Sequence, residues 1–467
     1  TARFVPRFMV VRCEAGSCSV MARPFTRLGH TWSRLRNYVL VHYSFIVGTL
    51  CVMAATTART IRADIEARIA AGELRSGDRL QSVRDLAAEL DVAPATVAAA
   101  YRELRLRAMV SGRGRQGTLV AQARRVEASF QDDTPDGLID AHDGSPDPNQ
   151  LPALGPALAY AASLPQPRYG GQLIEPLLAD AARHQFETDH IESQNLAITS
   201  GAMDAVQRVL AAFDLRVGDR IGVEDPGHIP VHQLARSLGL ELIALPVDEH
   251  GITPAGLEAG LQAGLAALVV TPRAHNPTGA AFNAERAMIL SELLAHHPAA
   301  ALIQDDHAGF ISGVDYHPIA APGPRWATMR SLGKSLGPDV RVALVAGDEQ
   351  TINRVNIGLS NGPGWVSFIL QRVAAYLLND PATTTLLAET ADSYTRRRTL
   401  LIEALATQQL ASSGISGINV WIPTVHEHAA IAAVRAAGYA IRSGTPYQLT
   451  PARAIRVTIS NLTDAHI

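Results

Sequence analysis

Short apolar stretches alternate with helical stretches over roughly 200 residues, and this alternation constrains the fold more than any other feature of the chain. The apolar stretches are residues 196–200, 220–224, 241–245, 267–271, 301–304 and 342–346. Strands that alternate with helices pair in parallel, because each helix returns the chain to the same edge of the sheet. The sequence from residue 138 to residue 467 therefore predicts an α/β domain with a mainly parallel sheet. Ligands of such sheets bind at the carboxyl ends of the strands.

Polar residues follow several of the predicted strands. Backbone N–H groups after the first strand can bind a phosphate, because that turn opens a helix. An amide side chain after residue 271 can hold a polar ligand, and a carboxylate after residue 304 can serve a cofactor, a metal ion or a helix cap. The residues concerned are Ser200, Gly201, Ala202, Asn276, Asp305 and His307.

Lys334 is the only lysine of the sequence, among 41 basic residues of which the others are arginine. Arginine is permanently charged, whereas lysine can lose its proton and form a Schiff base with a carbonyl compound. Lys334 stands in a turn-rich loop, SLGKSLGPDVR (331–341), that follows another extended stretch. It is therefore the leading candidate for a reactive residue.

The order of these motifs resembles that of fold-type I pyridoxal 5′-phosphate (PLP) enzymes of the aspartate aminotransferase superfamily, over residues 155–460. The resemblance implies an internal aldimine on Lys334, with Asp305 paired to the ring nitrogen and Asn276 bonded to the ring 3-oxygen. It implies a phosphate site made by the 200–202 turn, Ser331 and Arg341. It also implies a small C-terminal α+β subdomain.

The same resemblance assigns two residues outside the cofactor's own loops. Tyr169, in RYGG (168–171), matches a tyrosine that reaches the phosphate from the partner subunit, and Arg456 matches the arginine that binds a substrate carboxylate. The sequence departs from the family at two positions. His307 replaces a tyrosine that donates to the ring 3-oxygen, and His228 replaces an aromatic residue that stacks on the ring. Binding should survive both changes, whereas transamination is in doubt.

Residues 58–122 have the pattern of a helix-turn-helix followed by a basic two-stranded wing. Ile61, Ile65 and Ile69 lie on one face of a first helix, Ser82 can cap a second helix, and Pro94 suits the start of a third. Residues 109–120 read as two short strands joined by a Gly/Arg tip. This is a DNA-docking shape. A small adaptor that binds protein is the alternative.

This stretch resembles the GntR winged-helix family in LQSVRDLAA (80–88), VAPATV (92–97), YREL (101–104) and GRQGT (114–118). It departs from the family at Gln81, Ala95 and Ala108. We expect the second helix of the motif to enter the major groove and the wing to reach phosphate or the minor groove. The expected DNA-binding residues are Arg84, Thr96, Tyr101, Arg102, Arg113 and Arg115.

Charge is unevenly distributed along the chain. The net charge is +6 for residues 1–57, +5 for residues 58–125 and −14 for the remainder, which suggests that the front of the chain meets a polyanion. Residues 123–137 are polar and aperiodic and read as a linker. All three cysteines lie within the first 51 residues, which excludes a disulfide framework in the rest of the chain and favours a cytoplasmic setting.

Residues 1–57 contain an apolar run at 38–55 that also fits a signal peptide or a short membrane span. We favour a third interpretation, in which translation begins at Met53 and residues 1–57 are an extension that is not native. We expect no membrane association.

A GntR winged helix joined to an aminotransferase-like domain resembles the MocR family of bacterial transcriptional regulators. That resemblance implies a domain-swapped homodimer that binds double-stranded DNA and senses an amino compound or a B6 vitamer through the lysine aldimine. The aminotransferase-like domain would serve as a sensor that can retain residual transaminase activity. A working aminotransferase with an accessory DNA-binding-like domain is the alternative, since both need the same lysine.

Overall fold

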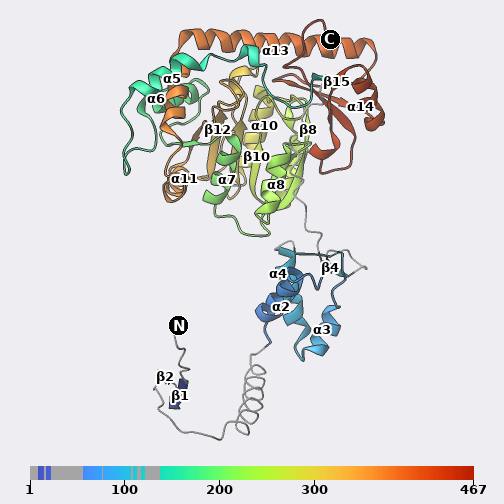
Figure 1. Cartoon of the computed structure of the whole chain (residues 1–467). Coiled ribbons are helices and arrows are strands. Elements are labelled where there is room, and N and C mark those ends of the chain that lie inside the picture. The colour runs from blue at the N-terminus through green and yellow to red at the C-terminus, as the bar shows by residue number, and fades with distance from the viewer. Residues whose placement is uncertain are drawn as a thin grey trace, which may run out of the picture. The chain divides into compact units, whose positions relative to one another are not determined.

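The computed structural model of the chain describes residues 9–14, 17–22, 56–75, 77–106, 109–112, 117–120 and 137–467 (Figure 1). Within it the chain forms two compact units, Thr1–Arg75 with Leu80–Arg102, and Ser76–Arg79 with Glu103–Ile467. The predicted linker (except for Gly137), the apolar run 38–55 and the wing tip lie outside the described residues. The domain boundaries predicted from the sequence remain predictions.

The helix-turn-helix comprises α2 (Ala58–Ala70), α3 (Val83–Glu89) and α4 (Pro94–Leu106). The Ser82 side chain accepts a hydrogen bond from the backbone N–H of Asp85 and so caps α3, as predicted. The buried apolar residues recur at the helical spacing that the sequence indicates. They are Ile61, Ile65, Leu86, Ala87, Val97, Ala100, Tyr101 and Leu104. Nearer the N-terminus, β1 (Met9–Glu14) pairs antiparallel with β2 (Ser17–Ala22).

The wing is an antiparallel pair of short strands, β3 (Val110–Gly112) and β4 (Thr118–Val120). Residues 77–79 add a third extended segment, because the backbone of Val120 exchanges hydrogen bonds with Gly77 and Asp78 at 2.9 and 2.8 Å. Arg105 Nη2 donates to Thr118 Oγ1 at 3.0 Å and fixes the wing to the end of α4.

The large unit is built on an eight-stranded sheet in the order β6-β13-β12-β11-β10-β7-β8-β9. The central pairs are parallel, as predicted, whereas β13 runs antiparallel to both of its neighbours and β9 antiparallel to β8. The strands are β6 (Leu196–Thr199), β7 (Arg220–Asp225), β8 (Glu241–Asp248), β9 (Gly251–Ile252), β10 (Leu265–Val270), β11 (Ala301–Asp306), β12 (Trp326–Ser331) and β13 (Ala343–Gly347).

Helices cover both faces of this sheet, and each face has its own hydrophobic core (Figure 1). One face is covered by α7 (Ala202–Ala212), α8 (Ile229–Ser237) and α11 (Glu349–Asn361). The other is covered by α9 (Pro254–Gln262), α10 (Ala284–Ala295) and a layer made of α5 (Leu154–Ser163), α6 (Pro176–Thr188), α12 (Phe368–Asn379) and α13 (Pro381–Thr407).

The C-terminal part is the small α+β subdomain that the sequence predicts. Its sheet has the order β14-β17-β16, from β14 (Asn419–Pro423), β17 (Ala454–Thr458) and β16 (Arg442–Ser443), beside α14 (Glu427–Ala436). Strand β5 (Ile139–Asp140), the first strand after the wing, pairs with β15 (Tyr439–Ala440). Short 3-10 turns occur at Pro148–Gln150, Gly309–Ile311 and Thr445–Tyr447. None of the helices among the described residues is long and apolar enough to cross a membrane.

Candidate functional site

Lys334 lies in the loop that follows β12, at the carboxyl edge of the sheet, as the sequence predicts. Its side chain is half-buried, and its Nζ donates a hydrogen bond to the carbonyl of Gly144. Burial of the amine, reinforced by the positive charge of Arg456, lowers the pKa of Lys334 to about 8. A lysine with a lowered pKa supplies more neutral amine near pH 7, which is the form that attacks a carbonyl.

Asp305, at the end of β11, is a buried carboxylate with one unsatisfied oxygen. It is 3% exposed, and its Oδ1 has no hydrogen-bond partner among the described residues. Burial, together with the nearby charges of Asp306 and Glu224, raises the pKa of Asp305 to about 7. A buried carboxylate without a partner is costly. A protonated ring nitrogen would satisfy this oxygen, and so the residue fits the PLP-binding role that the resemblance implies.

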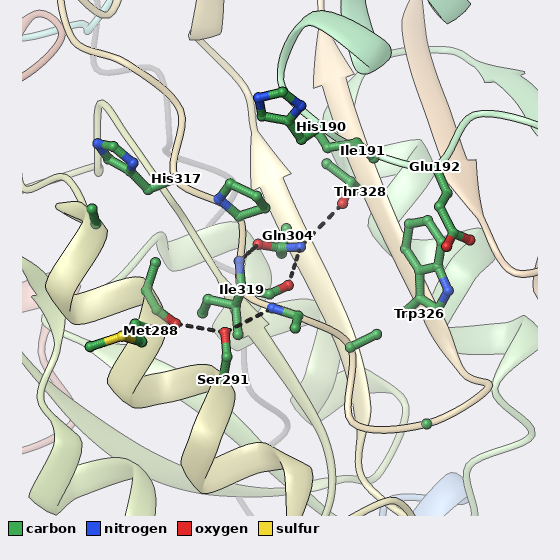
Figure 2. A pocket seen from close by; sticks show the side chains of 16 residues that line it. His190, Ile191, Glu192, Met288, Ser291, Gln304, His317, Ile319, Trp326 and Thr328 are labelled. Carbon is green, nitrogen blue, oxygen red and sulfur yellow. Dashed lines mark hydrogen bonds between the residues drawn. The ribbon is translucent and has the colours of Figure 1, made fainter.

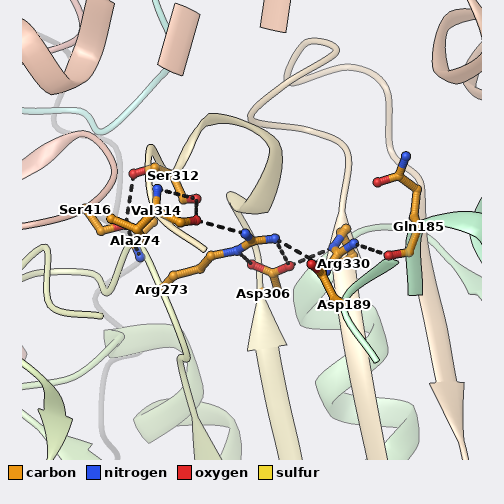
Figure 3. A network of polar contacts seen from close by, with 9 residues as sticks. All are labelled: Gln185, Asp189, Arg273, Ala274, Asp306, Ser312, Val314, Arg330 and Ser416. Atoms are coloured by element: carbon orange, nitrogen blue, oxygen red, sulfur yellow. Dashed lines mark hydrogen bonds and ion pairs between the residues drawn. The ribbon is translucent and has the colours of Figure 1, made fainter. Parts of the chain in front are cut away.

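Because successive side chains of a strand alternate between its two faces, the neighbouring Asp306 lies on the opposite face of the sheet from Asp305. Its carboxylate is paired with two arginines (Figure 3). Its oxygens accept from Arg273 Nε at 2.9 Å and Arg330 Nε at 2.7 Å. Burial alone would raise the pKa of Asp306, but the two guanidinium groups outweigh it and hold the pKa far below its usual value. Arg330 also donates to Asp189. This network of four charges joins the ends of α6, β10, β11 and β12.

Two histidines stand where the family has other aromatic residues. The rings of His228 and His307 are nearly parallel, with an interplanar angle of 10° and centroids 6.4 Å apart. Burial, together with the charge of Lys334, lowers the pKa of both, that of His307 to about 4. Both rings are therefore neutral near pH 7, and each keeps one N–H to donate to a ligand.

The predicted phosphate-binding residues come together at the amino end of α7. Gly201 has φ +92°, and a Cβ there would lie 2.5 Å from Arg341 Nη2, so only glycine lets the guanidinium approach. Arg341 Nη2 donates to the carbonyl of Ser200 at 3.2 Å. Ser331 Oγ and Arg341 Nη1 both lie within 4 Å of the Cβ position of Gly333. The helix terminus, the hydroxyl and the guanidinium together suit a phosphate group.

Arg456, on β17, is 2% exposed and lies next to Asn276, one of the expected cofactor-binding residues. Its Nη1 donates to Asn276 Oδ1 at 3.0 Å, and its Nη2 donates to the carbonyl of His142. The ring of Tyr447 packs against the guanidinium, with its centroid 5.3 Å from Cζ. The structure thus brings Asn276 and Arg456 together.

Tyr169 lies apart from these residues in its own chain. Its side chain is 94% exposed, and its ring centroid is 5.4 Å from that of Trp365. A large aromatic side chain displayed in this way is available to another molecule. This agrees with the expectation that Tyr169 serves the site of a partner subunit, which remains a prediction.

Only some of the expected DNA-binding side chains are exposed to solvent, where DNA could reach them. Arg84 and Arg102 are exposed on α3 and α4, and Thr96 is half-buried. Tyr101 is different, since it is 1% exposed and its hydroxyl donates to the carbonyl of Gln81 at 2.9 Å. Tyr101 therefore holds α4 against the start of α3, and its side chain is not presented to DNA as expected. Arg113 and Arg115 lie outside the described residues.

A separate cavity of about 660 Å³ lies on the α10 face of the sheet (Figure 2). Gln304 lines it, but its amide is already bonded to the backbone of Ile319 and to Thr328. None of the expected cofactor-binding residues is among its lining residues. Because successive side chains of β11 point to opposite faces, this cavity is distinct from the surroundings of Asp305.

Two family models match the chain. Residues 57–120 match the bacterial regulatory proteins of the gntR family, and residues 164–467 match the aminotransferases of class I and II. The vitamin B6 salvage pathway transcriptional repressor PtsJ of Salmonella typhimurium is 36% identical over 415 residues, which cover 88% of this chain and 96% of PtsJ. The chain belongs to the MocR family of transcriptional regulators.

Other MocR-type relatives are more distant. The transcriptional regulator TauR of Rhodobacter capsulatus is 28% identical, covering 76% of this chain and 81% of TauR. The pyridoxine biosynthesis regulator PdxR of Corynebacterium glutamicum is 29% identical over 55% of this chain and 58% of its own. The kynurenine aminotransferase of Pyrococcus horikoshii superposes with a TM-score of 0.64 at 19% identity, over 71% of this chain and 88% of that one. This likeness confirms the aminotransferase fold of the MocR large domain.

The sequence did not reveal every residue that shapes this MocR site. Arg273 and Arg330 stand in no motif of their own, and the sequence marks Asp306 only as the neighbour of Asp305 at the end of a predicted strand. The adjacent pair Asp305-Asp306 was the available signal, since two neighbouring buried carboxylates need different partners. The carbonyls of His142 and Gly144 carry no sequence signal, because any residue has a backbone carbonyl.

Proposed function

We propose that this MocR protein is a PLP-dependent transcriptional regulator that binds operator DNA and senses an amino compound or a B6 vitamer at Lys334. The supporting observation is the unsatisfied Oδ1 of Asp305 at the same strand edge as the lowered-pKa amine of Lys334. The match to the gntR family supports DNA binding by the winged helix. The relatives PtsJ, PdxR and TauR are named as transcriptional regulators, which supports a role in gene regulation.

Each residue of the site would bind a different part of PLP. Asp305 would pair with the ring nitrogen, Asn276 and His307 would donate toward the ring 3-oxygen, and His228 would pack against the ring. The turn at 200–202, Ser331 and Arg341 would hold the phosphate. When bound, PLP supplies an aldehyde that condenses reversibly with amines and a ring that withdraws electrons.

We further propose that the protein works as a homodimer in which Tyr169 completes the partner's phosphate site. The exposed ring of Tyr169, which lies against the half-buried Trp365, supports this, together with the exposed apolar side chains of Leu158 and Ile369. The proposed location is the cytoplasm, where the DNA partner lies. PtsJ acts on vitamin B6 salvage by its name, so B6 vitamers are the first effectors to test.

A footprint of the full chain on its own upstream DNA, with and without PLP and candidate amines, tests the proposal. We expect protection of a discrete site that PLP or an amine alters. An amino-acid-dependent aminotransferase turnover that is sustained, without protection of any DNA site, would favour the enzyme alternative.

A further inference from the structure

The cavity on the α10 face of the sheet is enclosed by a frame whose polar groups already have partners (Figure 2). Ser291 Oγ donates to the carbonyl of Ala287 at 2.6 Å and accepts from the backbone N–H of Ala320 at 2.9 Å. The amide of Gln304 exchanges hydrogen bonds with the backbone of Ile319, at 3.2 and 2.9 Å. These bonds hold the segment before β12 against α10 and β11. The volume of about 660 Å³ lies in the usual range of small-molecule sites, about 300–1,000 Å³.

The apolar part of the lining includes one aromatic ring that is held firmly in place. Trp326, the first residue of β12, is half-buried and packs against two hydrophobic cores of the large unit. Ile191 and Met288 extend this apolar surface, and Met288 is 56% exposed. A ring that is already fixed loses little conformational freedom when a ligand packs against it. The cavity therefore suits a ligand with an apolar body.

The charge of the lining is negative. Glu192 is its only carboxylate, and none of the residues that line the cavity is an arginine or a lysine. The other ionisable side chains of the lining are His190 and His317. None of these three side chains has a hydrogen bond or an ion pair with another residue of the described ranges. An anion would thus meet a carboxylate without a lysine or arginine to bind it, whereas a cation would find a free carboxylate.

The segment that carries Glu192 is anchored by the end of α6. The backbone N–H of Ile191 donates to the carbonyl of Phe186 at 2.8 Å, and the side chain of Ile191 is buried. His190 has φ +57°, and this left-handed conformation turns the chain out of the helix. Figure 2 shows Glu192 and Trp326 on the same side of the cavity. The carboxylate and the aromatic ring are therefore both presented by ordered backbone.

We propose that this cavity is a second small-molecule site, which binds an organic monocation with an apolar body. The cationic group lies between the Glu192 carboxylate and the ring of Trp326, because the face of an indole attracts a cation. The apolar body packs against Ile191 and Met288. The site is separate from the proposed PLP site, since Gln304 and Asp305 are neighbours on β11 and point to opposite faces.

The test uses benzyltrimethylammonium, a quaternary cation that cannot condense with the aldehyde of PLP and so does not report on Lys334. Benzyl alcohol and benzoate are its neutral and anionic counterparts. In calorimetric titrations of the full-length PLP-loaded chain at pH 8, we expect one cation to bind per chain. It should bind at least about ten-fold more tightly than benzyl alcohol, and benzoate should not bind. Equal affinities of the three probes, or no binding of the cation, would overturn the inference.

A matched pair of variants tests the role of the carboxylate. Glu192→Gln keeps the size of the side chain and removes its charge. We expect it to weaken binding of benzyltrimethylammonium by about five-fold or more and to leave binding of benzyl alcohol unchanged. Glu292→Gln changes an exposed carboxylate on α10 that does not line the cavity, and it should match the wild type. Equal cation affinities of Glu192→Gln and the wild type would contradict the proposed site.

A third variant fills the cavity. Ala321 is an exposed residue of the lining, and Ala321→Phe should abolish binding of both benzyltrimethylammonium and benzyl alcohol. Cation binding that persists in Ala321→Phe would place the bound probe elsewhere and overturn the inference. The titration should give the same affinity without PLP, because the two sites are separate. A wild-type chain that binds the cation and does not bind PLP would therefore contradict the proposed function and support this site.

Discussion

Arg456 Nη1 donates to Asn276 Oδ1 at 3.0 Å, so one hydrogen bond joins the residue expected to bind a ligand carboxylate to one expected to bind the cofactor ring. The two side chains come from different parts of the large unit, the C-terminal subdomain and the loop after β10. Because the Arg456 guanidinium is buried, loss of the Asn276 side chain would leave one of its N–H groups without this hydrogen-bond acceptor.

Asn276 should therefore matter for stability as well as for binding. Asn276→Ala leaves a buried guanidinium N–H without its partner, and we expect the free energy of unfolding to fall by about 1–3 kcal/mol. Asn276→Asp restores an acceptor with a charge and should regain most of that loss. Urea denaturation of the two variants measures the difference, and equal losses would show that this hydrogen bond contributes little.

Asp305 should affect stability and cofactor binding in opposite directions. Its raised pKa of about 7 means that the folded protein without PLP holds a proton that the unfolded chain releases above pH 4. Its stability therefore decreases as pH rises from about 4 to 7. Asp305→Asn removes this dependence, so the variant without PLP should be more stable than the wild type at pH 8 and about equal to it at pH 4.

The same variant should bind PLP at least about ten-fold more weakly, since a neutral amide cannot form an ion pair with the ring nitrogen. Thermal unfolding at the two pH values and a PLP titration give the two readouts. A variant that is less stable at pH 8 and binds PLP normally would contradict both the burial argument and the assigned role.

The Asp306 network should be a main contributor to the stability of the strand ends. Arg330→Met removes one of the two cations beside a fully buried carboxylate, and we expect a loss of about 3–5 kcal/mol in the free energy of unfolding. The matched control is Arg183→Met, which breaks an ion pair with Asp180 on the surface, where such pairs contribute about 0–1 kcal/mol. Similar losses in both variants would mean that the network is not coupled as described.

The sequence was sufficient for features that local pattern determines. The alternation of strands and helices gave the parallel core of the sheet, and Ser82 and Pro94 gave the starts of α3 and α4. The antiparallel direction of β13 was not predictable, because a strand's own residues do not specify its neighbours. Tyr101 belongs to a motif of the GntR family, and for that reason it was expected to bind DNA. Its helical spacing from Val97 and Leu104 indicated instead the buried face of α4, where the structure places it.

In the candidate site, too, the sequence predicts residues that local pattern marks and does not predict contacts between distant residues. Lys334 stood out because the composition isolates it, and Asp305 because it ends a strand. The pairing of Asp306 with two arginines depends on side chains more than 20 residues apart in sequence. The hydrogen bonds of Lys334 to the Gly144 carbonyl and of Arg456 to the His142 carbonyl join residues 190 and 314 positions apart. Neither arrangement has a local signature.

We expect Lys334 to bind PLP covalently, through its amine. Its positive charge alone should not be enough. Lys334→Arg keeps the positive charge but cannot condense with an aldehyde. We expect this variant to lose the visible absorbance of protein-bound PLP, as should Lys334→Ala, whereas specific DNA binding persists in both. Spectra of the purified variants with added PLP measure this, and retention of the band in either variant would refute the role of Lys334.

Arg84 and Arg102 should contribute to DNA binding mainly by neutralising phosphates. Each cation that leaves the interface reduces the slope of log affinity against log salt by about 0.9 for duplex DNA. We expect Arg84→Ala and Arg102→Ala to weaken operator binding and to flatten this slope, and Arg113→Ala with Arg115→Ala to do the same for the wing. Arg435→Ala, on an exposed position of α14, is the control. Because phosphate contacts carry no base information, the loss should be similar for operator and unrelated DNA. An unchanged slope in a weakened variant would indicate that the arginine reads bases, or acts on the fold, and does not bind phosphate.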